Sequence, residues 1–189
     1  MLRRIFIALN LPEQTKKELF ALKERWPELP ARWTKPENIH LTLVFLGNTA
    51  DRELKEVRKL MDGVGERHAP FSLTLEEVSY GPSPSNPRMV WAKLSESDNL
   101  RALQEDTEKT LGNSQQLSYI PEKRDFASHL TLARLREWEF KKMPPEERPD
   151  IEETLSISFL VESIDIMESK LKRGGAEYTL AARFLLRKV

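Results

Sequence analysis

Hydrophobic positions repeat with two different periods along the chain, and the two periods predict a mixture of helices and strands. Apolar residues return at helical spacing in three segments, 13–26, 54–64 and 98–111. Two-residue alternation or short apolar runs predict strands over 1–9, 39–46, 71–76, 89–94, 126–135, 155–161, 163–171 and 177–186. Segments rich in proline, glycine or charge separate these elements, over 27–36, 81–87, 113–124 and 141–150.

The order of these elements predicts two related α+β lobes. Each half contains a helix, a strand with polar residues on one face, and a hairpin, and hairpins favour antiparallel pairing. The Gly174-Gly175 pair predicts a tight hairpin between the last two strands, and residues 47 and 48 (Gly-Asn) are expected to end the strand before them. A doubly wound parallel sheet does not fit this order.

One four-residue word, HLTL, occurs twice, at residues 40–43 and 129–132. From ordinary residue usage, a second copy arises by chance in roughly one chain of this size in several hundred. Alternate side chains of a strand share a face, so each histidine and threonine face one way while the leucines face a lobe core. Since His40 and His129 are two of three histidines in the chain, we expect two halves of one site.

Composition limits the chemistry that this site can carry. The chain has 189 residues and no cysteine, which excludes disulfides, thiolate metal ligands and a cysteine nucleophile. Its net charge is zero, so contact with nucleic acid must come from local basic clusters. No apolar run is long enough to span a bilayer, and the N-terminal run is interpreted as a strand, not a signal peptide. We therefore expect a cytoplasmic protein without membrane contact.

Two strand-borne histidines admit three uses. A metal site needs three or four ligands, and neither a cysteine nor a third histidine lies near the repeated word. Buried histidines that only pack are the second possibility, which the repetition of the word disfavours. The third use is acid–base catalysis, because one imidazole can accept a proton while the other donates one. That pair of actions suits displacement at phosphorus, without a metal or any other cofactor.

The threonines and nearby basic residues extend the third possibility. Thr42 and Thr131 lie two residues after their histidines, so their hydroxyl groups can hold one phosphate between the imidazoles. Basic residues flank both words: Arg32, Lys35, Lys123, Arg124 and Arg134. We expect Lys35 and Lys123 to be solvated surface charges. Strand alternation places Arg134 on the leucine face, so a phosphate contact there requires a twist or a bulge.

Three aromatic residues could stack on a base: Trp33, Tyr80 and Trp91. Core packing is the expected role of Trp91. The third histidine, His68, follows a predicted helix in a polar linker, and we expect it to be an exposed loop residue. The residues expected to bind RNA are therefore Arg32, Trp33 and Arg134.

The two words and their surroundings resemble a known family. The paired His-x-Thr-Leu words are typical of the two-histidine (2H) phosphoesterase superfamily, and the chain resembles its RNA 2′,3′-cyclic phosphodiesterases, also called 2′-5′ RNA ligases. The resemblance covers most of the length, through RIFIALNLP at 4–12, RWTKPENIHLTL at 32–43, FLG at 45–47, PRMVW at 87–91 and HLTLAR at 129–134. Two features depart from the family pattern. Ser128 replaces a frequent proline, and loop 81–87 lacks the expected aromatic and basic residues.

The resemblance implies a bilobal α+β fold: two pseudo-symmetric lobes, each with an antiparallel sheet facing a central cleft and helices outside. Residues 1–189 would form one domain of two intertwined lobes, each contributing one HLTL strand. The implied reaction is metal-free hydrolysis of RNA 2′,3′-cyclic phosphate ends to 2′-phosphates. His129 would be the base and His40 the acid, with Thr42 and Thr131 holding the phosphate, and the reverse reaction would be a 2′-5′ ligation without ATP.

Two alternatives remain at this point. The chain could be a 2H phosphoesterase for another cyclic or 2′-5′-linked nucleotide, or a module that binds RNA ends without catalysis. A pure binding module usually presents a wide basic surface, which a neutral chain lacks. The expected partner is an RNA end or short oligonucleotide with a 2′,3′-cyclic phosphate, bound by a monomer.

Overall fold

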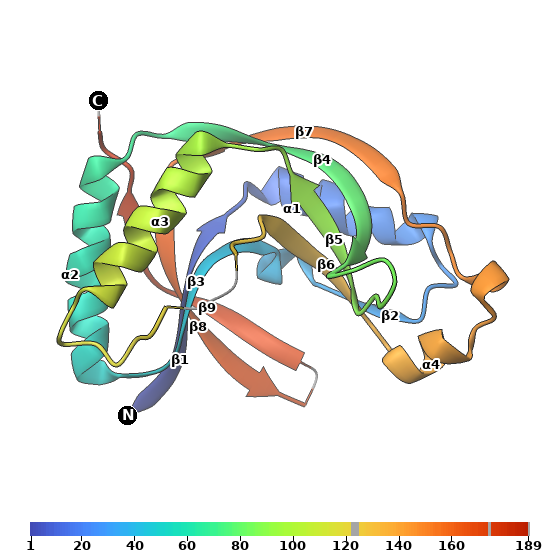
Figure 1. The fold of residues 1–189 in the computed structure, drawn as a ribbon, viewed down its shortest axis with the longest axis horizontal. Coiled ribbons are helices and arrows are strands. Elements are labelled where there is room, and N and C mark those ends of the chain that lie inside the picture. Colours follow the sequence, from blue (N-terminus) through green and yellow to red (C-terminus); the bar gives the residue numbers. More distant parts are fainter. Residues whose placement is uncertain (122–124, 174, 189) are drawn as a thin grey trace.

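A computed structural model of the protein describes residues 1–121, 125–173 and 175–188 (Figure 1). The strands are β1 (Leu2–Asn10), β2 (Ala31–Trp33), β3 (His40–Ala50), β4 (Phe71–Gly81), β5 (Met89–Leu94), β6 (His129–Leu135), β7 (Glu153–Val161), β8 (Ser163–Lys172) and β9 (Gly175–Leu185). The α-helices are α1 (Glu13–Ala21), α2 (Asp51–Arg67), α3 (Asp98–Gly112) and α4 (Glu137–Lys142). Short 3₁₀ helices follow at Leu22–Arg25, Pro36–Asn38 and Pro145–Glu147.

The strands form an antiparallel sheet in the order β7-β4-β5-β6-β3-β1-β8-β9, with β2 paired to β6. The two strands that carry the repeated word, β3 and β6, meet in the middle of this order. Within the described residues they pair at one position, Leu41 with Leu130. The α+β class with two groups of antiparallel strands is therefore confirmed, and this central pairing makes the two groups continuous.

Strand β1 shows why its sequence is an unbroken apolar run. It lies between β3 and β8, and both of its faces are covered, so Ile5 to Leu9 are all fully buried. Ile5, Ile7 and Leu9 belong to the main core. The opposite face carries a second, smaller cluster, which comprises Phe6, Ala8, Met167 and Tyr178.

The helices pack on the outside of the strands. Helices α2 and α3 lie side by side along one end of the molecule (Figure 1), and their buried faces contain the apolar stripes that the sequence predicted. The predicted cap of α3 is confirmed, because the side chain of Ser97 accepts a hydrogen bond from the backbone N–H of Leu100 at 3.2 Å. None of the described helices is long and apolar enough to cross a membrane.

The leucines of both words belong to one core, not to two. Leu41, Leu43, Leu130 and Leu132 are at most 4% exposed and lie in the same cluster of buried residues. The expectation of a separate core for each lobe is wrong, because the pairing of β3 with β6 brings the two leucine faces together.

Several elements differ from the sequence prediction. Strand β3 continues past Gly47 to Ala50, since Gly47 adopts a φ of +72° beside a register shift that bends the strand without ending it. The proline-rich connector contains β2, which pairs with residues 133–135. Helix α4 was not predicted, and it ends just before the prolines at 144 and 145. The predicted hairpin glycine Gly174 lies outside the described residues.

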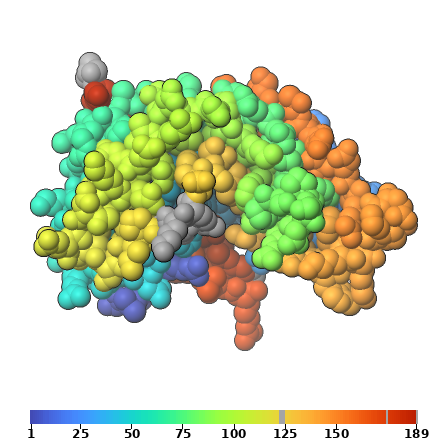
Figure 2. Space-filling model, viewed as in Figure 1, coloured from blue at the N-terminus to red at the C-terminus, as the bar shows by residue number. Residues whose placement is uncertain are grey.

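Strands β8 and β9 form a hairpin that projects at one edge of the molecule (Figures 1 and 2). Leu171, near its end, is 75% exposed. The hairpin is anchored near its base by a buried charge, because Asp165 is fully buried and accepts two 2.8 Å hydrogen bonds from Arg183 and one of 2.6 Å from Asn10. This ion pair is satisfied on both oxygens, as a buried carboxylate requires.

We expect Leu41→Ala to lower the free energy of unfolding by about 2–5 kcal/mol, because the substitution leaves a cavity at the position that joins the two strand groups. Urea unfolding measures this change. Leu160→Ala on β7 is the matched control, since that side chain is 48% exposed, and it should change stability by no more than about 0.5 kcal/mol. Equal losses in the two variants would contradict the central role of this pairing.

Candidate active site

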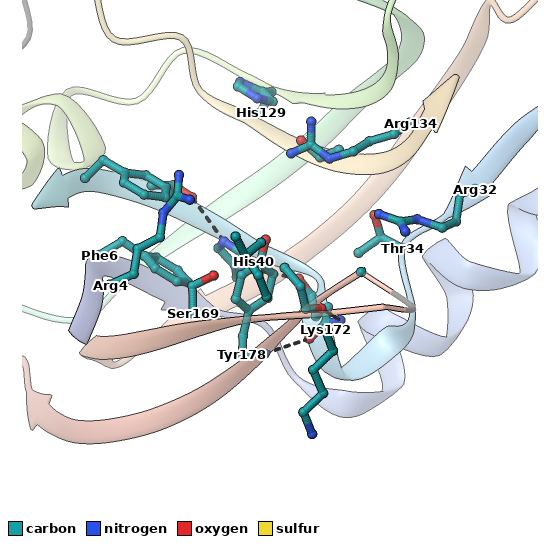
Figure 3. A pocket seen from close by; sticks show the side chains of 17 residues that line it. Arg4, Phe6, Arg32, Thr34, His40, His129, Arg134, Ser169, Lys172 and Tyr178 are labelled. Carbon is teal, nitrogen blue, oxygen red and sulfur yellow. Dashed lines mark hydrogen bonds between the residues drawn. The ribbon is translucent and has the colours of Figure 1, made fainter. Parts of the chain in front are cut away.

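A cavity of about 370 Å³ opens beside the central pairing, and it contains both copies of the polar pair. His40, Thr42, His129 and Thr131 all line it. Figure 3 shows His40 on one side of the cavity, with His129 and Arg134 on the strand across from it. The two polar pairs therefore face one space, as the repeated word predicted.

Both imidazole rings are held in the same way. Nδ1 of His40 lies 2.7 Å from the carbonyl oxygen of Asn38, and Nδ1 of His129 lies 2.8 Å from that of Ala127. A carbonyl oxygen can only accept, so Nδ1 carries the proton in each ring. In the neutral form, Nε2 is then the basic nitrogen of each histidine. Nε2 of His40 lies 3.1 Å from Oγ1 of Thr42.

His40 sits in an apolar setting formed by the smaller cluster. Its ring centroid lies 4.9 Å from that of Phe6 and 5.0 Å from that of Tyr178, which meets it edge-on. Burial lowers the pKa of His40 to about 4, against the raising effect of the Asn38 hydrogen bond and with smaller lowering effects from the positive charges of Lys16 and His129. His40 is therefore neutral near pH 7 in the free protein.

His129 is supported by an aromatic ring from the neighbouring strand. Its imidazole stacks on Trp91 with centroids 3.7 Å apart and planes 19° apart. Trp91 in turn lies flat against Gly81, where a Cβ atom would stand 2.2 Å from the indole ring. The expectation that Trp91 packs in the core is wrong, because this half-buried ring belongs to neither core cluster and instead fixes the plane of the second histidine.

Arg134 lies on the histidine face, not the leucine face. Strand β5 pairs with Ala133 and then with Thr131, so Leu132 is passed over in the register. This bulge shifts the alternation by one residue, which buries Ala133 and brings Arg134 into the cavity with His129. The expectation from strict alternation is wrong for this reason.

Of the other two residues predicted to contact RNA, one lines this cavity and one does not. Arg32 lines the cavity, and its guanidinium group packs on Gly175, where a Cβ atom would lie 2.9 Å from a guanidinium nitrogen. Trp33 is not among the residues that line this cavity. Its ring stacks on Trp26 with centroids 6.3 Å apart and packs against the main core, although it also borders an adjoining cavity.

Tyr80 and His68 have structural contacts elsewhere. The Tyr80 hydroxyl donates to the carbonyl oxygen of Pro149 at 2.8 Å, and burial raises its pKa to about 12. His68 is not the exposed residue that was expected, because its side chain is 17% exposed and Nε2 lies 2.9 Å from Asp106. Lys123 and Arg124 lie outside the described residues.

Sequence reasoning missed several residues of the cavity wall, among them Arg4, Phe6, Asn38, Ser169 and Tyr178. Arg4 and Phe6 share a face by alternation on β1, which is a signal that could have been used. Arg4 lies over the Phe45 ring, 5.5 Å from its centroid. Tyr178 had no local signal, because it reaches His40 through the pairing of β9 with β8 and of β8 with β1.

The described residues contain no group of three or more histidine, cysteine, aspartate or glutamate side chains that could hold a metal ion. The polar groups of the cavity are imidazole, hydroxyl, amide, guanidinium and ammonium groups. Such a set donates hydrogen bonds and positive charge, so it suits an anion.

Comparison with known proteins finds relatives over nearly the whole chain. The LigT-like phosphoesterase family matches residues 9–91. An RNA 2′,3′-cyclic phosphodiesterase of Thermus thermophilus is 30% identical over 194 residues, which cover 97% of this chain and 90% of that protein. A protein of the same name from Archaeoglobus fulgidus is 29% identical over 134 residues, which cover 70% of this chain and 73% of the relative.

Solved structures agree on the fold. A crystal structure of a Thermus thermophilus protein matches with a TM-score of 0.82 at 28% identity, covering 98% of each chain. The Escherichia coli LigT structure with 3′-AMP matches with a TM-score of 0.78 at 24% identity, covering 98% of this chain and 99% of that one. At that identity the second likeness concerns the fold alone.

We expect His40 to titrate near pH 4 in a histidine NMR titration, because its ring is desolvated. An unfolded chain binds this proton near pH 6.5, so between those values the unfolded state holds more protons than the folded state. The contribution of His40 to stability is complete above pH 6.5 and is lost as the pH falls toward 4. A titration midpoint of 6.5 for His40 would contradict the burial of its ring.

Proposed function

Because the chain belongs to the LigT-like family of RNA 2′,3′-cyclic phosphodiesterases, we propose that it hydrolyses RNA 2′,3′-cyclic phosphate ends to 2′-phosphomonoesters by paired histidine acid–base catalysis. One observation carries the proposal. His40 and His129 line one cavity from two strands, and a carbonyl oxygen holds Nδ1 of each ring so that Nε2 remains for chemistry.

The proposed reaction is a displacement at phosphorus. One imidazole takes a proton from water, whose oxygen forms a bond to phosphorus. The bond between phosphorus and the 3′ oxygen breaks, and the second imidazole gives its proton to that oxygen. The products are a 2′-phosphate and a 3′ hydroxyl group. Thr42 and Thr131 would donate hydrogen bonds to the non-bridging oxygens, which keeps phosphorus aligned between the two rings.

We assign the base to His129 and the acid to His40, following the family resemblance. This assignment requires a protonated His40 in the substrate complex, whereas burial keeps the ring neutral in the free protein. A phosphate anion beside Nε2 favours the imidazolium form, so substrate binding itself promotes uptake of the needed proton. His129 is the ring with easier access to water, because its contact with the carbonyl oxygen of Ala127 is exposed whereas the corresponding contact of His40 is partly buried.

Arg134 and Arg32 supply positive charge at the phosphate and are proposed to bind the RNA end. Trp33, which packs against the main core and also borders the adjoining cavity, is proposed to contact the RNA end there. The proposal includes a single domain of two intertwined lobes, a monomer working in the cytoplasm without a metal or other cofactor. The same two imidazoles, with roles exchanged, would run the reaction backwards as a 2′-5′ ligation that needs no ATP.

We expect His40→Ala and His129→Ala each to lower kcat by roughly 10²–10⁴-fold on RNA oligomers ending in 2′,3′-cyclic phosphate, assayed with EDTA. The double variant should lose little more than either single one, because the two rings act as a unit. His68→Ala is the matched control and should keep the wild-type kcat, since His68 contacts Asp106 away from the cavity.

Three results would contradict the proposal. Full activity in both cavity variants would exclude histidine catalysis. Tight binding with no 2′-phosphate product, even with protein in excess over RNA, would instead favour a module that binds RNA ends. Loss of wild-type activity in EDTA would exclude the metal-independent mechanism.

The two roles can be separated with a substrate that carries sulfur in place of the bridging 3′ oxygen. A thiolate leaves without a proton, so the acid is no longer needed while the base still is. We expect His40→Ala to recover most of its lost rate on this substrate and His129→Ala to recover none. The opposite pattern would exchange the two roles but leave the paired mechanism in place.

A further inference from the structure

A second cavity, of about 520 Å³, adjoins the catalytic one. The two share lining residues, including Arg32, Arg134 and Tyr178, so they form one continuous depression. The second cavity extends away from the histidines between the segment that follows β2 and the start of β9. There it is bordered by Lys35, a residue expected from the sequence to be a solvated surface charge.

This depression is positively charged although the chain as a whole is neutral. Its lining contains four basic residues and two acidic ones: Arg32, Lys35, Arg134, Lys172, Glu37 and Glu177. Lys172 and Glu177 form an ion pair, and hydrogen bonding to Lys172 holds the pKa of Glu177 below its usual range. Among residues 1–121, 125–173 and 175–188, no ion pair forms at Lys35 or Arg134, and the charge of Lys35 adds a smaller lowering effect on the pKa of Glu177.

One residue ties the wall of the second cavity to the catalytic strand. The backbone carbonyl of Asn38 holds Nδ1 of His40 at 2.7 Å. Its side chain donates to the carbonyl oxygen of Ala176 at 3.1 Å and accepts from the backbone N–H of Tyr178 at 3.3 Å. The start of β9 therefore keeps a fixed position relative to His40, and a group bound between them would be positioned against the catalytic ring.

We propose that this second cavity binds the phosphodiester on the 5′ side of the terminal nucleotide, so that the enzyme prefers oligonucleotide ends to mononucleoside cyclic phosphates. The inference rests on the proposed function. A 2′,3′-cyclic phosphate closes the 3′ end of RNA, so the rest of the strand can leave the catalytic cavity only through the 5′ side. The continuous, cationic depression is a path for it, and Lys35 is the contact for the next phosphate.

Lys35→Ala should raise KM about 3–10-fold for a short RNA oligomer with a cyclic phosphate end and leave kcat unchanged. A mononucleoside 2′,3′-cyclic phosphate, which lacks the second phosphate, should be turned over as by the wild type. The slope of log KM against log salt for the oligomer should decrease by about 0.7, the value for one phosphate contact on a single strand. Lys35→Arg should restore binding.

Glu177→Gln should change KM for the oligomer in the opposite direction. Removing this carboxylate releases Lys172 and takes one negative charge from the cavity wall, so KM for the oligomer should fall below the wild-type value. Lys59→Ala is the control for charge removal elsewhere, because Lys59 lies exposed on α2, which lines neither cavity. Lys59→Ala should leave KM unchanged for both the oligomer and the mononucleoside 2′,3′-cyclic phosphate.

The outcomes separate this inference from the proposed function. Suppose that the wild type hydrolyses both substrates, and that Lys35→Ala either changes neither KM value or raises both by the same factor. The proposed site for the 5′ phosphate is then wrong, while the proposed phosphodiesterase activity is retained. If the wild type hydrolyses neither substrate, the proposed function fails. An oligomer-specific rise in KM with Lys35→Ala, together with a fall with Glu177→Gln, supports the site.

Discussion

The pairing of Leu41 with Leu130 is the contact on which the other features of this protein depend. It joins two groups of antiparallel strands through the end strand of each group, and it buries the leucines of both words in one core. Because side chains alternate on a strand, the same contact that buries the leucines directs both histidine–threonine pairs to the opposite side. The apolar half of each word thus builds the fold, and the polar half builds the cavity.

The two histidines are alike in their backbone contacts and unlike in their surroundings. In both, the carbonyl oxygen two residues earlier fixes the proton on Nδ1. His40 then lies among Phe6 and Tyr178, which keep it desolvated, whereas His129 is half-exposed on the face of Trp91. Identical four-residue words therefore provide two chemically different groups, which is what a reaction needing one acid and one base requires.

Positive charge is concentrated by tertiary structure, not by composition. The chain carries equal numbers of acidic and basic residues, yet arginines from β1, β2 and β6 and a lysine from β8 converge on the cavity. A neutral protein can in this way bind an anionic end without a broad basic surface. Local positive charge and hydrogen-bond donors are then sufficient to bind the anion.

Local patterns were sufficient to predict most helices and strands, the α+β class and the two polar pairs. The apolar stripes of α2 and α3 and the alternation in β3 and β6 are set by residues within a few positions of each other, so period alone identifies them. Period alone missed β2 and α4 because both elements are short. Strand β2 forms through its pairing with β6, and helix α4 is bounded by the prolines that follow it.

The repeated word and the alternation of a strand were enough to predict that two identical histidine–threonine pairs face away from the leucines. Tertiary structure brings the two pairs into one cavity, since the contact between β3 and β6 joins residues far apart in the chain. It also decided the face of Arg134, because a bulge is a property of the register between two strands. The register of a strand is set by the strand that pairs with it, so it cannot be predicted from the alternation of one strand alone.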